Sequence, residues 1–127
     1  MGRQLVAALK KELPEQELIG VGTNSVATLA MQKAGADRVA TGENAVVVCC
    51  RTADIIVGSL GIAIADSMLG EITPVMAAAV GGSPAKRVLI PFDSCDNLIV
   101  GASELPAGKR IAAAVEMVKR LTTPETA

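Results

Sequence analysis

The fold is decided by the stretch Gly2-Arg3-Gln4-Leu5-Val6-Ala7-Ala8-Leu9-Lys10-Lys11-Glu12-Leu13 and by the apolar run Leu18-Ile19-Gly20-Val21-Gly22, which follows Pro14. The first stretch has the spacing of an amphipathic helix, and the second is typical of a buried parallel strand. Together they form the second half of a strand–helix–strand unit, in which a helix crosses over between parallel strands. Since no strand stands before this helix, the sequence predicts a parallel sheet whose first strand is missing and which has an open edge or a gap at its centre.

The rest of the chain alternates between helical and extended patterns. A β-branched run at 45–51 favours a helix over 43–52, because the strand at 53–58 follows too closely for two parallel neighbours. Further helices are expected at 26–34, 60–69, 73–80 and 109–121, and further strands at 37–40, 87–91 and 97–101. This alternation predicts one Rossmann-like domain over 1–127, a three-layer α/β sandwich with a mainly parallel sheet and a flexible tail at 122–127.

Composition points to self-association. Half of the 127 residues are hydrophobic, only 1% are aromatic, and Phe92 is the sole aromatic side chain. The mean hydropathy is +0.45, yet the uncharged stretches at 55–65 and 72–85 are shorter than the roughly 20 residues of a membrane span. We therefore expect the leftover apolar surface to be buried in a homo-oligomer and not in a membrane.

Charge and residue usage exclude several functions. The net charge is −1 and no basic face is visible, which argues against nucleic-acid binding. Arg3 and Lys10-Lys11 interrupt the apolar start, so no secretory signal is expected, and three cysteines without zinc-like spacing indicate the reducing cytoplasm. The chain has no histidine, which removes the usual neutral-pH base and the Ser-His-Asp triad.

A ligand site is expected where the parallel strands end, since ligands of such sheets bind beyond the carboxyl ends. Polar segments that follow the predicted strands, such as the turn at 41–44 and the loop at 93–96, are expected at this edge. The glycines allow close backbone approach and helix N-termini attract anions, although the same residue types serve as ordinary helix caps. The candidate cofactor-binding residues are Thr23, Asn24, Ser25, Gly58, Ser59 and Gly61, with Gly2 as the last glycine of a phosphate-binding turn or as a residue without a role.

Reactive groups are few. Adjacent Cys49 and Cys50 are interpreted as buried, inert thiols and not as a redox or metal pair, whereas Cys95 stands in a polar loop at the expected ligand edge. Asp66 lies in an apolar run, where a carboxyl group either gains a catalytic role or simply faces solvent. Acid–base chemistry would depend on these carboxylates: Glu43, Asp54, Asp66, Glu71, Asp93 and Asp96.

Several segments resemble an uncharacterised family of small bacterial proteins of unknown function. They are Val21-Gly22-Thr23-Asn24-Ser25-Val26-Ala27-Thr28, Lys33-Ala34-Gly35-Ala36-Asp37-Arg38, Ala40-Thr41-Gly42-Glu43-Asn44-Ala45, Ala53-Asp54-Ile55-Ile56-Val57-Gly58, Gly61-Ile62-Ala63-Ile64-Ala65-Asp66-Ser67, Leu69-Gly70-Glu71-Ile72-Thr73-Pro74 and Cys95-Asp96-Asn97. The resemblance implies one more N-terminal strand and a turn similar to Asp-Gly-Gln-Gly-Gly-Gly-Ile-Gly, of which Gly2 is the only glycine present here. It implies no activity.

These observations predict a cytoplasmic nucleotide- or dinucleotide-binding domain of unknown reaction. Thr23-Asn24-Ser25 stand where an acidic residue often binds the ribose of NAD, and their hydroxyls and amide fit a phosphorylated ribose or another ligand. NAD(P) or another nucleotide is therefore the candidate cofactor. The alternative is a non-enzymatic regulatory or scaffolding oligomer, and a third hypothesis is an enzyme that uses Cys95 or Asp66.

Overall fold

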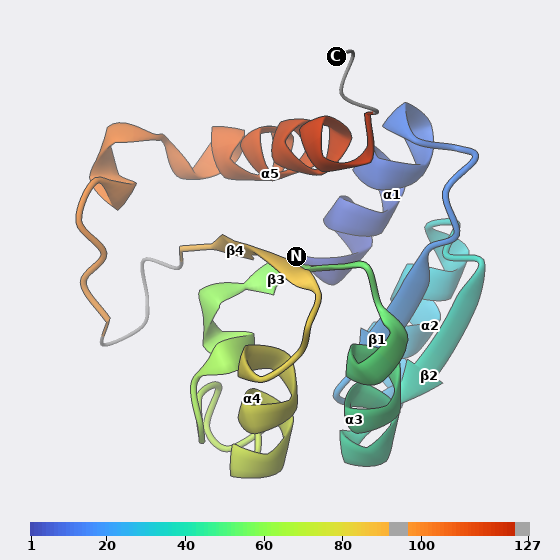
Figure 1. Ribbon diagram of the computed structural model, residues 1–127, viewed down its shortest axis with the longest axis vertical. Helices are drawn as coiled ribbons and strands as arrows, with labels where there is room; N and C mark the ends of the chain where they lie inside the picture. The colour runs from blue at the N-terminus through green and yellow to red at the C-terminus, as the bar shows by residue number, and fades with distance from the viewer. Residues whose placement is uncertain (92–96, 124–127) are drawn as a thin grey trace.

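The computed structural model describes residues 1–91 and 97–123 of an α/β protein (Figure 1). Its elements follow one another as α1 Gly2–Glu12, β1 Ile19–Gly22, α2 Ser25–Lys33, β2 Arg38–Thr41, α3 Glu43–Thr52, β3 Ile55–Ser59, the 3₁₀ turn η1 Leu60–Ala63, α4 Pro74–Gly81, β4 Lys86–Ile90, the 3₁₀ turn η2 Ala102–Glu104 and α5 Ala107–Thr122.

The strands form two parallel pairs. β1 pairs with β2 from Ile19 opposite Arg38, and β3 pairs with β4 from Ile55 opposite Lys86. Among the residues that the structure describes, no strand joins one pair to the other. The predicted parallel α/β class is confirmed, and the structure has two small sheets where the sequence predicted one. Within the described residues, β1 and β3 are each paired along one edge only.

The helices pack in two groups. α1 contacts both α2 and α5, and α5 also lies on β4 (Figure 1). α3 packs on α4, away from that group, around a second apolar cluster of Ile72, Met76 and Ala77. The main core lies between α1, α5 and the β3–β4 pair and consists of Leu5, Leu9, Val88, Ile90, Ala114, Val115 and Val118.

Local sequence signals explain where the helices begin. The Asn24 side chain accepts a hydrogen bond from the Ala27 amide at 2.9 Å and so caps α2. Thr73 caps α4 by accepting from the Met76 amide at 3.1 Å, and Pro74 follows in the first helical position. The helix predicted over the β-branched run is confirmed as α3.

Two sequence predictions are wrong. The helix expected at 60–69 is one 3₁₀ turn followed by further turns, with Asp66, Met68 and Leu69 at positive φ. The Asp66 amide donates to the Ile72 carbonyl at 2.7 Å, six residues ahead, whereas in a helix it would donate to the carbonyl four residues before it. The strand expected at 97–101 consists of irregular chain and turns, since no strand of the described chain lies in ladder pairing with it.

The closing helix is longer at both ends than predicted, so that Thr122 belongs to α5 and not to a tail. Thr123 of the expected tail is the C-cap of α5, whereas 124–127 and the expected loop at 93–96 with Cys95 lie outside the described residues. Within the described part of the chain, no helix has the length and apolarity needed to cross a membrane.

Candidate functional site

The structure brings a distant carboxylate to the turn between β1 and α2. The Glu71 Oε1 atom lies 3.5 Å from the Thr23 hydroxyl and 3.3 Å from the Asn24 side-chain amide, both of which donate to it. Ser25 is the exposed first residue of α2. Thr23 and Asn24 follow the carboxyl end of β1. The polar groups that the sequence predicted there therefore have a carboxylate as their hydrogen-bond acceptor.

Asn24 has two roles that use different atoms. Its Oδ1 atom caps α2, while its Nδ2 group donates to Glu71. Because the cap holds the amide plane in place, the NH₂ group points toward the carboxylate in a fixed orientation. Glu71 itself is exposed, so a ligand can reach the same carboxylate from solvent.

A second carboxylate joins the starts of α3 and α4. The Thr73 hydroxyl, which caps α4, donates to the Glu43 Oε2 atom at 2.6 Å, and Glu43 stands in the first turn of α3. Negative charge near a helix N-terminus is favourable because the backbone N–H groups there carry partial positive charge. Glu43 thus stabilises the first turn of α3, and the Glu71 carboxylate lies beside Asn24, which caps α2.

The end of β3 contains an unsatisfied hydroxyl. Ser59 is only 6% exposed, and its Oγ atom has no hydrogen-bond partner within the described residues. Buried polar groups normally have partners, so this atom can bind a group absent from the structure. No described hydrogen bond links Ser59 to Thr23, Asn24 or Glu71, so the structure does not join the two halves of the predicted site.

The predicted glycines have packing neighbours. A Cβ on Gly58 would lie 2.8 Å from the Cδ1 atom of Ile62, and one on Gly61 would lie 3.3 Å from the Ser67 hydroxyl and from the Met68 methyl group. A Cβ on Gly2 would lie 3.1 Å from the Met31 sulfur, where α1 meets α2. Close packing accounts for these glycines, and their role toward a ligand remains a prediction.

Sequence reasoning overlooked Gly22 at the end of β1. A Cβ there would lie 2.8 Å from the Thr28 backbone nitrogen, so the turn can form only with glycine at this position. The Thr28 hydroxyl in turn contacts the Thr41 hydroxyl at 2.7 Å and donates to the Asn24 carbonyl at 3.0 Å. These contacts fix the β1–α2 turn against the end of β2. The sequence Val21-Gly22-Thr23-Asn24, in which a glycine stands between an apolar strand and a helix cap, was the signal from which this turn could have been predicted.

The other reactive candidates gain little support. Burial, and then the neighbouring Cys49, raise the pKa of the Cys50 thiol, as expected for an inert buried thiol. Asp66 is exposed and lies at positive φ. In the part of the chain that the structure describes, no three Cys, Asp or Glu side chains are grouped as a metal site.

An open hollow lies away from these residues, between α1 and α2. It has a volume of about 440 Å³ and is lined by Arg3, Val26, Leu29, Ala30, Lys33 and Ala34. None of the predicted site residues lines it.

Comparison with known proteins identifies one family. Residues 1–123 match the family model described as Domain of unknown function (DUF3842), which confirms the resemblance to an uncharacterised family. No curated protein and no solved structure matches the chain.

Proposed function

Because the chain belongs to the DUF3842 family, described only as a domain of unknown function, we propose a function from its own residues. The domain binds a nucleotide- or dinucleotide-type ligand at the carboxyl ends of its strands. Glu71, Thr23 and Asn24 bind the ribose hydroxyls. The observation that carries the proposal is the placement of the Glu71 carboxylate beside the β1–α2 turn.

The arrangement of helices supports a Rossmann-like three-layer fold as part of this proposal. α1, α2 and α5 form one layer and α3 and α4 another, with strand pairs that are parallel throughout. α2 covers both β1 and β2, whereas α1 covers β1 and contacts α5, which covers β4. These contacts favour the strand order β2–β1 followed by β3–β4. In such a sheet the ligand lies at the carboxyl ends, where the order reverses.

Glu71, Thr23 and Asn24, which we call the Glu71 cluster, have a chemistry that fits a vicinal diol. A carboxylate accepts hydrogen bonds from two adjacent hydroxyls, and the Thr23 hydroxyl and Asn24 amide hold it in position. A 2′-phosphate would place a second negative charge beside Glu71 and would be repelled. The proposed preference is therefore for a free ribose, as in NAD, over the phosphorylated ribose that Thr23-Asn24-Ser25 alone suggested.

Ser59 supplies a second supporting group. Its buried hydroxyl, unpartnered among the described residues, lies at the carboxyl end of β3, the edge at which the rest of the ligand would lie. A ligand oxygen in hydrogen-bond contact with this atom would remove the cost of leaving it unsatisfied.

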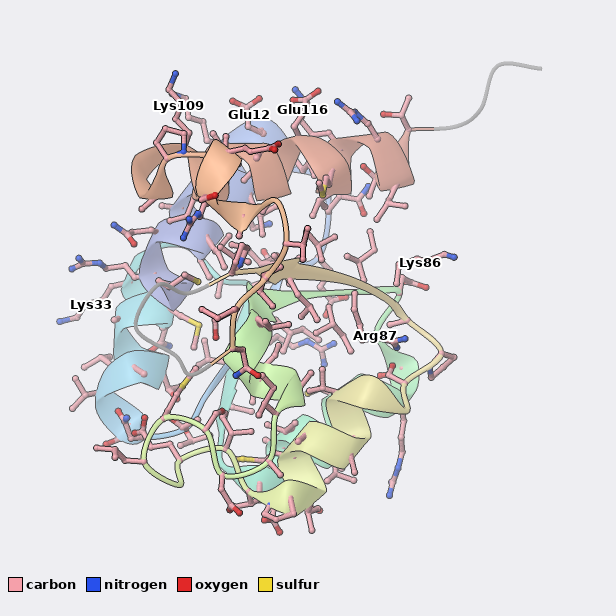
Figure 2. All side chains as sticks on the ribbon, turned by 90° about the vertical axis from the view of Figure 1, so that its left-hand side faces the viewer. Glu12, Lys33, Lys86, Arg87, Lys109 and Glu116 are labelled. Carbon is pink, nitrogen blue, oxygen red and sulfur yellow. The ribbon has the colours of Figure 1, made fainter. Side chains whose placement is uncertain are left out.

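The test compares free-ribose and 2′-phosphorylated ligands. Calorimetric titration with NAD, NADP and AMP is carried out on the wild type and on Glu71→Gln. Glu116→Gln on α5 serves as the control, because Figure 2 shows Glu116 on the far side of α5 from the β-strands. Hydrogen bonds to charged groups contribute about 1.5–3 kcal/mol, so Glu71→Gln should weaken NAD or AMP binding by roughly 10- to 150-fold. The difference in affinity between NAD and NADP should become smaller in this variant. Wild-type protein that binds none of the three ligands, or Glu71→Gln protein that binds like wild type, would overturn the proposal.

A further inference from the structure

The loop 66–72, between η1 and α4, holds an apolar side chain in solvent. Leu69 is 106% exposed and Met68 is 41% exposed, and the backbone φ angles of these two residues are 55° and 58°. Left-handed backbone is unfavourable for bulky side chains, and such strain is concentrated at functional sites. Leu69 therefore has neither a buried environment nor a relaxed backbone in its own molecule, which indicates a contact outside it.

Hydrogen bonds close this loop on itself. The Asp66 amide donates to the Ile72 carbonyl at 2.7 Å, and the Gly70 amide donates to the Asp66 carbonyl at 3.1 Å. Ile72 is only 4% exposed and anchors the loop in the second apolar cluster. The loop thus presents Leu69 in a fixed place, and a preordered side chain loses little conformational freedom when a partner covers it.

The hollow between α1 and α2 offers an apolar surface to such a side chain. One stripe of α2 lines this hollow of about 440 Å³, with the helical spacing i, i+3, i+4 and i+7: Val26, Leu29, Ala30 and Lys33. Val26 is 78% exposed and Leu29 is 48% exposed. The floor of the hollow is therefore apolar surface that α1 and α2 leave in contact with solvent.

The charges of the hollow and of the loop are opposite. Arg3 and Lys33 line the hollow, no lining residue is a carboxylate, and neither cation has an ion-pair partner within the described residues. Asp66 in the loop is exposed, and 64–72 contains no Lys or Arg. Two hollows that faced each other would set cations against cations, whereas the acidic loop is electrostatically complementary to the hollow.

The loop and the hollow lie on one side of the molecule. Glu71, near the end of the loop, accepts hydrogen bonds from Thr23 and Asn24, which directly precede α2. Figure 2 shows the loop, in yellow-green, and α2, in light blue, along the same side, with Lys33 projecting outward. Leu69 does not line the hollow of its own copy. A two-fold axis that crosses α2 can therefore bring the loop of each copy to the hollow of the other.

We propose that the tip of this loop in one copy inserts into the α1–α2 hollow of a second copy. Leu69 packs on the apolar floor of the hollow, and Asp66 forms an ion pair with Lys33. The second copy makes the same contacts in return, so that the dimer is closed. The Glu71 carboxylate takes no part in these contacts, so the association does not depend on the nucleotide binding proposed above.

The apolar contact is tested with Leu69→Asn. Asparagine tolerates positive φ better than leucine, and Leu69 is fully exposed, so the melting temperature of the monomer should not fall. Sedimentation at micromolar concentration should give about twice 12.9 kDa for the wild type, whereas this variant should dimerise about tenfold more weakly or worse. Leu98→Asn is the matched control, because Leu98 is 97% exposed outside both surfaces, and this variant should dimerise like the wild type.

The ion pair is tested by exchanging its charges. Asp66→Lys and Lys33→Glu each set like charges against each other in both contacts of the dimer, so each variant alone should dimerise weakly. In an equimolar mixture, a copy of one variant meets a copy of the other, and both contacts again join opposite charges. The mixture should therefore sediment as heterodimers. Because the same two proteins are measured alone and mixed, a loss of folding cannot produce this result.

Four results would overturn the inference. They are a wild type that is monomeric at every concentration, Leu69→Asn protein that dimerises like the wild type, a mixture that associates no better than the two charge variants alone, and a wild-type mass that grows beyond the dimer. The last result would show an open chain of contacts in place of the closed two-fold exchange.

Discussion

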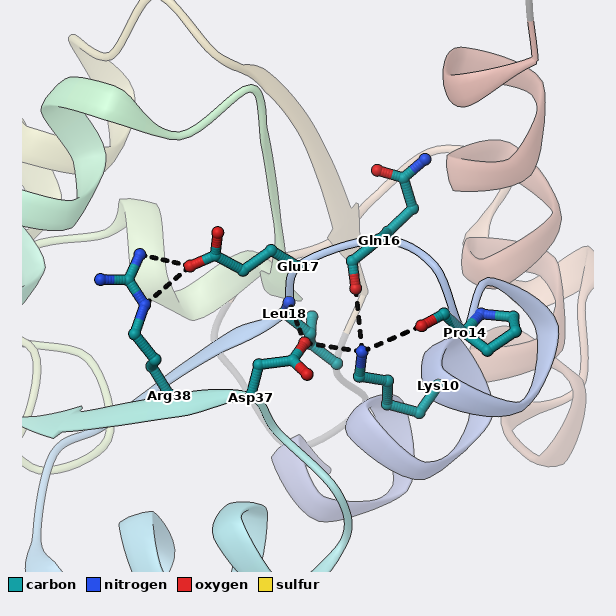
Figure 3. A network of polar contacts seen from close by, with 7 residues as sticks. All are labelled: Lys10, Pro14, Gln16, Glu17, Leu18, Asp37 and Arg38. Carbon is teal, nitrogen blue, oxygen red and sulfur yellow. Dashed lines mark hydrogen bonds and ion pairs between the residues drawn. The ribbon is translucent and has the colours of Figure 1, made fainter.

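Lys10 and Asp37 form an ion pair of 2.6 Å that joins α1 to the start of β2. The same Asp37 oxygen accepts a hydrogen bond from the Leu18 amide at 2.7 Å, and Lys10 also donates to the Gln16 carbonyl at 2.9 Å (Figure 3). One carboxylate therefore ties the helix, the approach to β1 and the approach to β2 together. These contacts lie at the amino ends of β1 and β2.

Acid should weaken this junction. The hydrogen bond from Lys10 and then that from the Leu18 amide lower the pKa of Asp37. A lowered pKa means that its stabilising effect is complete above the unfolded value of about 3.9 and is lost as the pH falls through the lower folded value. Asp37→Asn should remove this part of the pH dependence. Urea unfolding of both proteins between pH 7 and pH 3 measures how the free energy of unfolding depends on pH.

Glu12→Gln is the control for that experiment, because Glu12 pairs with Lys119 at 3.4 Å on the surface and surface pairs contribute little. An Asp37→Asn profile with the same acid slope as the wild type would contradict the assignment.

Glycine substitutions should separate close packing from open space. Gly22→Ala pushes a Cβ into Thr28 and should lower the free energy of unfolding by about 1–3 kcal/mol. Gly108→Ala in α5 meets no atom within 4 Å and should raise it by about 0.5–1 kcal/mol, since alanine is the better helix former. Denaturant unfolding of both variants checks the signs, and equal effects would be inconsistent with the turn geometry.

Arg110 should be important for stability, although it is not a residue of the Glu71 cluster. Arg110→Ala leaves the carbonyls of Pro91, Ala102 and Leu105 without their charged donor and should cost at least about 1.5–3 kcal/mol. The exposed Arg120→Ala on the same helix should change stability by less than about 0.5 kcal/mol. The free energies of unfolding of the two variants are measured with a chemical denaturant. Equal values would show that the Arg110 side chain does not stabilise these carbonyls.

Cys50 should react slowly in the folded protein. Its thiol is 7% exposed, and burial raises its pKa, so little thiolate is present to attack an alkylating reagent. Iodoacetamide at pH 8 followed by mass spectrometry should modify Cys49 first, and the two rates should approach each other in urea. Faster alkylation of Cys50 in the native state would show that the helix opens locally.

Two of the three residues of the Glu71 cluster were predictable from the sequence. Asn24 and Thr23 were expected at the edge because capping residues and strand ends are local patterns. Glu71 was recognised only as a possible acid, since it stands 48 residues from Thr23 and no local pattern encodes that approach. Its position depends on the turns around Asp66, Met68 and Leu69, whose positive φ values exclude the expected helix.

The sequence by itself determined the elements whose signals lie within one turn of chain, such as the cap of α4 at Thr73, the helix α3 and the apolar strand β1. Tertiary structure alone decided whether a β-prone segment becomes a strand. Leu98–Val100 and Ile55–Val57 are similar apolar runs, yet only the second has a neighbour, β4, with which its backbone bonds. A helix satisfies its peptide groups internally, whereas a strand needs a partner that a distant part of the chain, or another molecule, must supply.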